Sequence, residues 1–213
     1  MDLGDLRRDY NSQTGLSRKD LNPDPVIQFD QWFEQARQTE LKDPSAMSLA
    51  TADRNGIVTI RTVLLKIYDQ QGFVFFTNYE SKKARQIAEN PNVAILFPWL
   101  AQERQVKITG QAYRIPTTES LRYFLSRPRG SQLGAWVSQQ SSIISSRSLL
   151  MSKLEEIRQR FAEGDISLPE FWGGYRIKPS TIEFWQGQPD RLHDRFQYTR
   201  SADDSWEINR LAP

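Results

Sequence analysis

The chain has 213 residues, which is enough for one sizeable hydrophobic core, and a single domain is the simplest expectation. It carries 28 Lys and Arg against 26 Asp and Glu, so any anion site must come from a local arrangement and not from bulk charge. Cysteine is absent, which excludes disulfides, thiolate catalysis and Cys-ligated metal centres. A single histidine argues against a His-rich metal site, so redox chemistry here would need an organic cofactor.

The first 23 residues are polar and charged, which predicts a flexible N-terminal arm ahead of one domain at 24–213. The opening MDLGDLRRDY lacks the apolar core of a secretory signal. The longest apolar run, VAILFPWLA at 93–101, is far shorter than the roughly 20 residues that cross a bilayer. We therefore expect a cytoplasmic protein that meets neither membrane nor nucleic acid.

The spacing of apolar residues changes from helical to strand-like along the chain. Asp24 and Pro25 are a typical helix start, and the apolar residues after them predict a helix to about residue 39. Further helices are expected at about 82–89, 118–126 and 146–163, the last closed by Gly164. Runs rich in β-branched and aromatic residues predict strands at 46–52, 57–68, 73–78, 93–99 and 104–115, and then at WGGYRI, TIEFWQ, RFQYTR and WEINRL. This order favours an antiparallel β-barrel with peripheral helices over alternating βαβ units.

Two stretches place cations at positions where the protein could bind an anion. Lys82 and Lys83 follow Ser81 at a predicted helix start, where the helix dipole is already positive and free N–H groups could bind an anion. Tyr123 and Arg127 share a helix face and Ser131 follows the helix end, a donor set that suits a phosphate monoester. A solvated basic turn and an ordinary helix C-terminus are the alternative interpretations.

Other polar residues are less decisive. Arg61 and Lys66 lie in the apolar run RTVLLK, but odd spacing places them on opposite faces of a regular strand. Gln105, in ERQV, has the ordinary explanation of a solvated strand residue.

The only histidine, His193, lies between Arg191 and Arg195. In an extended strand these three side chains share one face, and such a row would repel itself unless an anion faced it. Neutralisation by Asp190 and Asp194 is the alternative.

These stretches, taken in order, resemble the pyridoxine (pyridoxamine) 5′-phosphate oxidase family over nearly the whole chain. The matching motifs are LRRDY, DP-x-AM, RTVLLK, FFTN, SKKARQI, LFPW, ERQV, SRPR-x-SQ-x-GAWVSQQSS, LPEFWGGYRI, FWQG, RLHDRF and INRLAP. Phe76 stands where a tyrosine is common, and Lys82 where an arginine is common. Lysine keeps the charge but loses bidentate phosphate recognition.

The resemblance implies a mainly β, α+β fold, a split β-barrel of Greek-key type that binds FMN at the interface of a homodimer. It implies an oxidase that converts pyridoxamine or pyridoxine 5′-phosphate to the aldehyde, with O2 as acceptor and H2O2 as product. Two rivals stay open: a related split-barrel flavoprotein with another substrate, and a non-enzymatic module that binds nucleic acid or phosphate.

Site residues follow from the same resemblance. Arg191 and His193 would lie over the reacting carbon. The FMN site would comprise Arg61, Thr62, Val63, Leu64, Leu65, Lys66, Phe76, Thr77, Lys82, Lys83, Gln105, Gln140, Ser141, Trp185 and Arg195. Substrate would be held by Arg7, Tyr10, Lys66, Tyr123, Arg127, Ser131, Arg191, Leu192 and His193, with Arg7 and Tyr10 closing over it from the arm. No metal ligand is expected.

Overall fold

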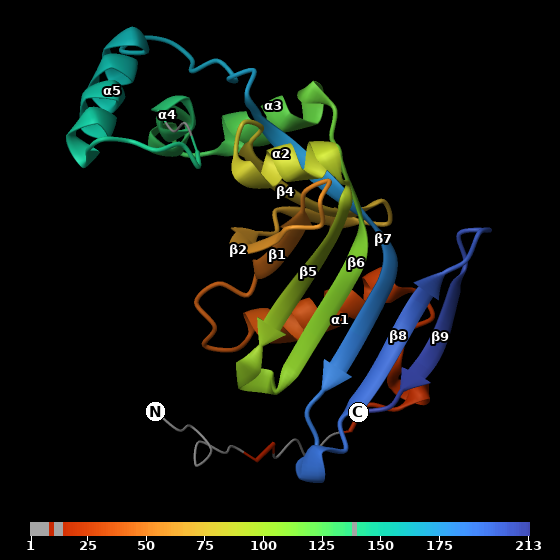
Figure 1. The fold of residues 1–213 in the computed structure, drawn as a ribbon. Coiled ribbons are helices and arrows are strands. Elements are labelled where there is room, and N and C mark those ends of the chain that lie inside the picture. Colours follow the sequence, from red (N-terminus) through yellow and green to blue (C-terminus); the bar gives the residue numbers. More distant parts are fainter. Residues whose placement is uncertain (1–8, 11–14, 138–139) are drawn as a thin grey trace.

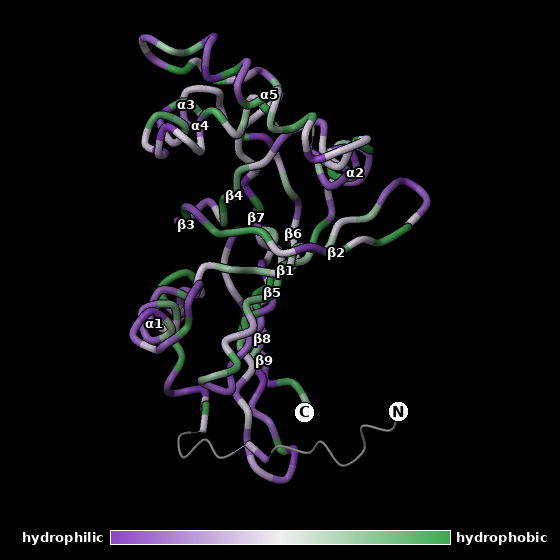
Figure 2. The backbone as a smooth tube through the Cα atoms, turned by 90° about the vertical axis from the view of Figure 1, so that its left-hand side faces the viewer, coloured by the Kyte–Doolittle hydropathy of each residue, from purple (hydrophilic) through white to green (hydrophobic). Residues whose placement is uncertain are grey.

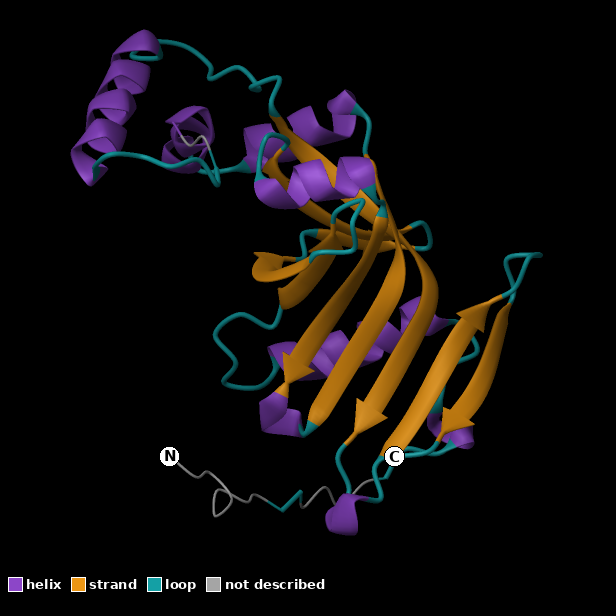
Figure 3. Ribbon diagram, in the orientation of Figure 1, coloured by secondary structure: helices purple, strands orange, loops and turns teal. Residues whose placement is uncertain are grey.

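A computed structural model describes residues 9–10, 15–137 and 140–213. The described chain is built around one curled antiparallel sheet, with α1 beside its lower part and α2 to α5 gathered at its other end (Figures 1 and 3). The sheet order is β2-β1-β5-β6-β7-β4-β3, and β8 and β9 continue from β7. This is the split-barrel, mainly β architecture with peripheral helices that the sequence predicts.

The elements lie close to the predicted ranges. The helices are α1 (Pro25–Arg37), α2 (Lys82–Glu89), α3 (Thr117–Ser126), α4 (Arg129–Val137) and α5 (Arg147–Arg160). The strands are β1 (Ala46–Ala52), β2 (Val58–Leu64), β3 (Ile67–Asp69), β4 (Gly72–Asn78), β5 (Asn92–Trp99), β6 (Arg104–Arg114), β7 (Trp172–Gln186), β8 (Asp194–Arg200) and β9 (Trp206–Leu211). Short 3-10 turns occur at Arg18–Asp20, Leu100–Gln102 and Pro189–Arg191.

The expected strand at 57–68 is in fact two strands, because the chain changes its hydrogen-bonding partner in the middle. β2 pairs with β1, and the Leu65 N–H still bonds to the Ser45 carbonyl. The Lys66 N–H bonds instead to the Val74 carbonyl, and β3 then pairs with β4. The switch turns the Leu65 side chain into the core and leaves Lys66 exposed.

β7 is one strand of 15 residues and not the two expected strands, although Pro179 lies within it. Its first half pairs with β4, its second half with β8, and both halves pair with β6. The register to β6 shifts between Thr109 and Gly110, so Pro179 occupies an irregularity where a missing N–H is tolerated. Gly110 is required there, because a Cβ would lie 2.1 Å from the Lys178 carbonyl oxygen.

Two helix predictions need correction. Ser131 was expected to follow the end of a helix, but it lies within a further helix, α4, which starts immediately after Pro128. The helix expected to end at Gly164 ends earlier, with Phe161 as its C-cap, and Gly164 turns the following loop at φ +81°.

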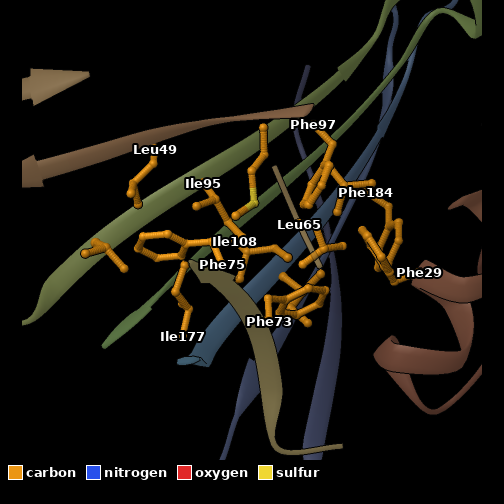
Figure 4. Close-up of a cluster of buried hydrophobic side chains, with 14 of the residues drawn as sticks. Phe29, Leu49, Leu65, Phe73, Phe75, Ile95, Phe97, Ile108, Ile177 and Phe184 are labelled. Carbon is orange, nitrogen blue, oxygen red and sulfur yellow. The ribbon is translucent and has the colours of Figure 1, made fainter. Parts of the chain in front are cut away.

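The hydrophobic core lies between the concave side of the sheet and α1. Phe29 on α1 is fully buried against Phe73 and Phe97 at centroid distances of 4.9 and 5.1 Å (Figure 4). Helix α1 alternates between hydrophilic and hydrophobic residues, as an amphipathic helix does (Figure 2). A second cluster, including Phe124, Leu133 and Trp172, joins α3 and α4 to the start of β7.

The end of the predicted arm packs against the domain. Leu16 and Leu21 are only 6% exposed and belong to the main core, so 15–23 contains apolar anchors that composition did not indicate. Most of residues 1–14 lies outside the described part of the chain. Among the described helices, none combines the length and apolar character that a membrane span requires.

Candidate functional site

A pocket of about 880 Å³ opens between β2, β4 and the helices α2, α3 and α4. This is within the usual size of ligand pockets, roughly 300–1,000 Å³. Its lining includes most of the residues expected to bind cofactor or substrate phosphate. They are Arg61, Thr62, Val63, Leu64, Lys66, Phe76, Thr77, Lys82, Lys83, Tyr123, Arg127, Ser131, Gln140 and Ser141.

The charge of the pocket is one-sided. Arg61, Lys66, Lys82, Lys83 and Arg127 line it, and no carboxylate is among the described lining residues. Elsewhere in the described chain, half-buried arginines such as Arg176 and Arg195 are paired with acids. Cations gathered without acids repel one another, so the pocket is built to receive anions.

Helix α2 directs its N-terminus at this pocket. Ser81 is its N-cap, and the fully buried hydroxyl accepts the Ala84 N–H at 3.4 Å. The Lys83 Nζ is buried and donates to Thr77 Oγ1 at 3.1 Å and to Gln140 Oε1 at 2.7 Å. Burial, and then repulsion from Arg61, lower the pKa of Lys83 to about 8. A bound anion would reverse that depression.

In the part of the chain that the structure describes, Arg61 is held on the pocket wall by neutral oxygens. Its Nη1 donates to the Leu49 carbonyl at 3.0 Å and to Thr51 Oγ1 at 2.7 Å, and its Nη2 donates to Thr59 Oγ1. The alternation of β2 directs the odd-numbered residues inward, which places Arg61 in the pocket. A guanidinium that faces Lys83 without a carboxylate is available for a ligand anion.

The other end of the pocket is a stack of planar groups. Phe76 and Tyr123 stack at 3.9 Å between ring centroids, and Trp172 is nearly parallel to both. The Arg127 guanidinium lies 4.7 Å from the Trp172 ring, and its Nη1 is buried and has no hydrogen-bond partner among the described residues. Burial raises the pKa of Tyr123, against the opposing effect of Arg127, so the phenol stays an O–H donor. Phenol and guanidinium therefore both offer donors to an anion.

A second group of predicted residues lies elsewhere, between the ends of β7 and β8. Tyr10 contacts Trp185 and His193 edge-on, at centroid distances of 5.5 and 5.3 Å. The His193 Nδ1 accepts the Gln188 N–H at 3.1 Å, so a neutral ring carries its proton on Nε2. The loop between β7 and β8 lies at one end of the long strands, and helices α2 and α3 lie at the other (Figure 1).

The expected row of Arg191, His193 and Arg195 on one strand is wrong. Strand β8 begins only at Asp194, and Arg191 ends a 3-10 turn in the left-handed conformation at φ 59°. Leu192 follows it and is exposed. Arg195 is inside the strand, where it donates to Glu183 Oε1 at 2.8 Å and to the Ala212 carbonyl at 2.8 Å. The suspected neutralisation comes chiefly from Glu183, a residue on the neighbouring strand.

The remaining predicted residues are placed as follows. Gln105 pairs with Trp185 across β6 and β7 and belongs to the second group, not to the pocket. Leu65 is 4% exposed in the core. Arg7 lies outside the described residues.

Trp172, Gly134 and Ala135 also line the pocket. They lie in the quoted motifs GAWVSQQSS and LPEFWGGYRI, but their apolar character gave no sign of a site. No group of three or more metal-ligating side chains occurs in the described ranges.

The curled sheet, and a pocket whose described lining holds cations and no carboxylate, define a split-barrel protein with an anion-binding cavity. The chain belongs to the pyridoxamine 5′-phosphate oxidase family. The family model described as pyridoxamine 5′-phosphate oxidase matches residues 33–161, and a second model, the pyridoxine 5′-phosphate oxidase C-terminal dimerisation region, matches residues 172–213.

Similar proteins span the whole chain. A pyridoxine/pyridoxamine 5′-phosphate oxidase of Rippkaea orientalis is 64% identical over 213 residues, with 100% of both chains covered. One of Yersinia pestis is 55% identical over 212 residues, covering 100% of this chain and 97% of its own. Among solved structures, PhzG from Burkholderia lata, in complex with tetrahydrophenazine-1-carboxylic acid, superposes with a TM-score of 0.85 at 28% identity, covering 92% of this chain and 95% of its own. An FMN-binding protein of Nostoc punctiforme has a TM-score of 0.73 at 16% identity, covering 91% and 100%, which concerns the fold alone.

Proposed function

We propose that this protein is an FMN-dependent oxidase that makes pyridoxal 5′-phosphate. Pyridoxine 5′-phosphate plus O2 gives the aldehyde and H2O2. Pyridoxamine 5′-phosphate plus O2 and water gives the aldehyde, ammonia and H2O2. The full-length relatives that carry this name support the assignment at 55–64% identity.

The observation that carries the proposal is a pocket with five cations and no carboxylate among its described lining residues. Cofactor and substrate each bring a phosphate, and the cations form two clusters. Arg61, Lys82 and Lys83 surround the N-terminus of α2, a favourable place for one phosphate. Lys66 and Arg127, with the hydroxyls of Tyr123 and Ser131, would hold the other.

The chain's residues fit FMN on physical grounds. The Lys83 amine and the Gln140 and Ser141 side chains surround the α2 end, and Thr77 Oγ1 accepts from Lys83 at 3.1 Å. The backbone of β2 would line the ring system. Bound FMN supplies the two-electron acceptor that no side chain of this composition offers.

The second group of residues joins the site through a homodimer, which the match to the dimerisation region supports. Within one protomer, the loop between β7 and β8 lies at the other end of the long strands from helices α2 and α3 (Figure 1). We infer that the same residues of a second protomer cover the pocket, with Arg191 and His193 over the reacting carbon. The His193 Nε2 would then donate a hydrogen bond to the substrate, because Nδ1 is occupied by the Gln188 N–H. Arg7, from the arm, would close over the substrate.

The test is spectroscopic. The purified protein, reconstituted with FMN, should show a flavin spectrum that pyridoxamine 5′-phosphate bleaches without O2 and that air restores. Unphosphorylated pyridoxamine should bleach it far more slowly, because the Arg127 cluster then has no anion to bind. Failure to retain FMN, or a bound flavin that pyridoxamine and pyridoxine 5′-phosphate both leave oxidised, would refute the proposal. The latter outcome would favour a split-barrel flavoprotein with another substrate.

A further inference from the structure

A buried glutamine lies behind the pocket wall without lining it. Gln86, on α2, is 4% exposed and is absent from the pocket lining. It follows Lys83 by three residues, so both side chains lie on one face of the helix. Its amide lies between α2 and the sheet, where it meets β1 and the hairpin before β2.

The orientation of this amide is fixed by its partners. The Gln86 Nε2 donates to the Ile57 carbonyl at 3.1 Å, and a carbonyl can only accept. The Oε1 therefore faces the two threonines and accepts from Thr51 Oγ1 at 2.6 Å and from Thr59 Oγ1 at 2.6 Å. A flipped amide would place an oxygen against the Ile57 carbonyl oxygen.

This arrangement sets the direction of both hydroxyl groups. A threonine hydroxyl has one hydrogen, and Thr51 and Thr59 each donate it to Gln86. Their lone pairs are left for Arg61, whose Nη1 bonds to Thr51 Oγ1 at 2.7 Å and whose Nη2 bonds to Thr59 Oγ1. One amide oxygen thus makes both hydroxyls acceptors toward the guanidinium.

We propose that Gln86 is the positioning residue for Arg61 and thereby sets the affinity of the pocket for the cofactor phosphate. A free arginine side chain loses rotamer entropy when it binds a ligand, and the threonine oxygens remove much of that loss beforehand. The inference rests on the proposed FMN function.

The experiment compares FMN with riboflavin, which lacks the phosphate. Gln86→Met keeps the length of the side chain but removes both the acceptor and the donor. It should raise the FMN Kd by about 5- to 20-fold, because the threonine hydroxyls are no longer held as acceptors for Arg61, and hydrogen bonds to a charged group are worth up to about 100-fold in all. The riboflavin Kd should stay within about twofold. Fluorescence titration of the apoprotein gives both constants.

Gln28→Met is the matched control. Gln28 is also a buried helical glutamine, 2% exposed on α1, and its Oε1 accepts the Asn22 N–H at 2.8 Å. It lies outside the pocket lining, so the variant should lose stability without changing the ratio of the two dissociation constants. A purely structural role for Gln86 would give this same result.

A double-mutant cycle tests the route through Arg61. Once Arg61→Ala has removed the guanidinium, adding Gln86→Met should change the FMN Kd no further. If Gln86→Met does not fold, Thr59→Val and Thr59→Ser replace it, because only serine keeps the hydroxyl and only valine should weaken FMN. An unchanged FMN Kd, equal weakening of FMN and riboflavin, or full additivity with Arg61→Ala would each overturn the inference. Wild-type protein that binds neither flavin would instead refute the proposed function.

Discussion

The pocket and the second group of residues, at the ends of β7 and β8 (here the β7–β8 region), both carry several cations. The two regions differ in whether those cations are paired with acids. In the β7–β8 region Arg195 is paired with Glu183, and Arg210 donates to Asp194 at 2.8 Å. Burial by itself raises the pKa of Glu183, but hydrogen bonds from Arg195 and Lys107 outweigh it and hold that pKa below its ordinary value. In the pocket, five cations meet hydroxyls, amides and aromatic rings, with no acid in the described lining.

The comparison distinguishes cations that stabilise the fold by pairing with acids from cations that are available to bind a ligand. Removing an arginine that is held by a buried carboxylate leaves that carboxylate uncompensated, so the variant loses stability as well as any contact with a ligand. The pocket cations have no acid among the described lining residues to compensate them until a ligand anion arrives. Burial, and then repulsion from Arg61, lower the pKa of Lys83. Variants of the two regions should therefore fail in different ways.

The largest effect is expected at Arg127. Its Nη1 is buried without a partner in the described chain, and its guanidinium lies over Trp172. Arg127→Ala should lower kcat/KM for pyridoxamine 5′-phosphate by about 150-fold or more, since a charged hydrogen bond and the orientation of the substrate are both lost. The FMN Kd should not change. Arg122→Ala, an exposed arginine on the same helix, is the control. Equal losses in both variants would contradict the assignment.

In the β7–β8 region we expect Arg195 and Arg191 to have different roles. Arg195→Ala should raise the FMN Kd by about 10- to 150-fold and should also lower the unfolding temperature, because Glu183 loses one of its two cations. Arg191→Ala should leave both quantities nearly unchanged and lower kcat/KM by a similar factor, because Arg191 is exposed on a turn. Flavin titration, thermal melts and assays at saturating FMN measure the three quantities. Flavin loss in Arg191→Ala alone would reverse the two roles.

The depressed pKa of Lys83 gives a pH dependence of known sign. Below about pH 8 the amine is protonated and fully attracts the phosphate, and above it the free protein loses that charge. The FMN Kd should therefore rise with pH above 8, by up to about tenfold per unit, while the riboflavin Kd stays flat. Lys83→Arg should abolish the dependence, because guanidinium stays charged. An FMN Kd that is constant from pH 7.5 to 9.5 would show that Lys83 does not bind the phosphate.

The smallest effect is expected at Lys82. It is exposed at the first position of α2 and lines the pocket, and an arginine is common at this place in the family. Lys82→Arg should tighten FMN by about 2- to 5-fold, because guanidinium can bind phosphate through two parallel hydrogen bonds. Riboflavin serves as the comparison. Weaker FMN binding in this variant would place Lys82 outside the phosphate cluster.

The sequence predicted the structure correctly wherever a pattern depends on interactions between residues that are close in the chain. Asp24 and Ser81 begin their helices as N-caps, and β1 occupies the expected range. The two basic clusters were visible as residue types at helix ends, and the structure brings both to one pocket. These features depend on neighbours within a few residues, which is why they could be read without a fold.

Sequence by itself determined the class of fold, the helix starts and the chemistry of the site, because capping, alternation and charge are local properties. Only the tertiary structure decided which strand each residue joins. Leu65 turned into the core because the chain changes partner strands there, and Pro179 stayed inside β7 because the register shift with β6 accommodates it. The tertiary structure also separated Arg191 from Arg195, since β8 begins only where it pairs with Gln186. Hydrogen-bond pairing joins residues that are far apart in the chain, and no local pattern records it.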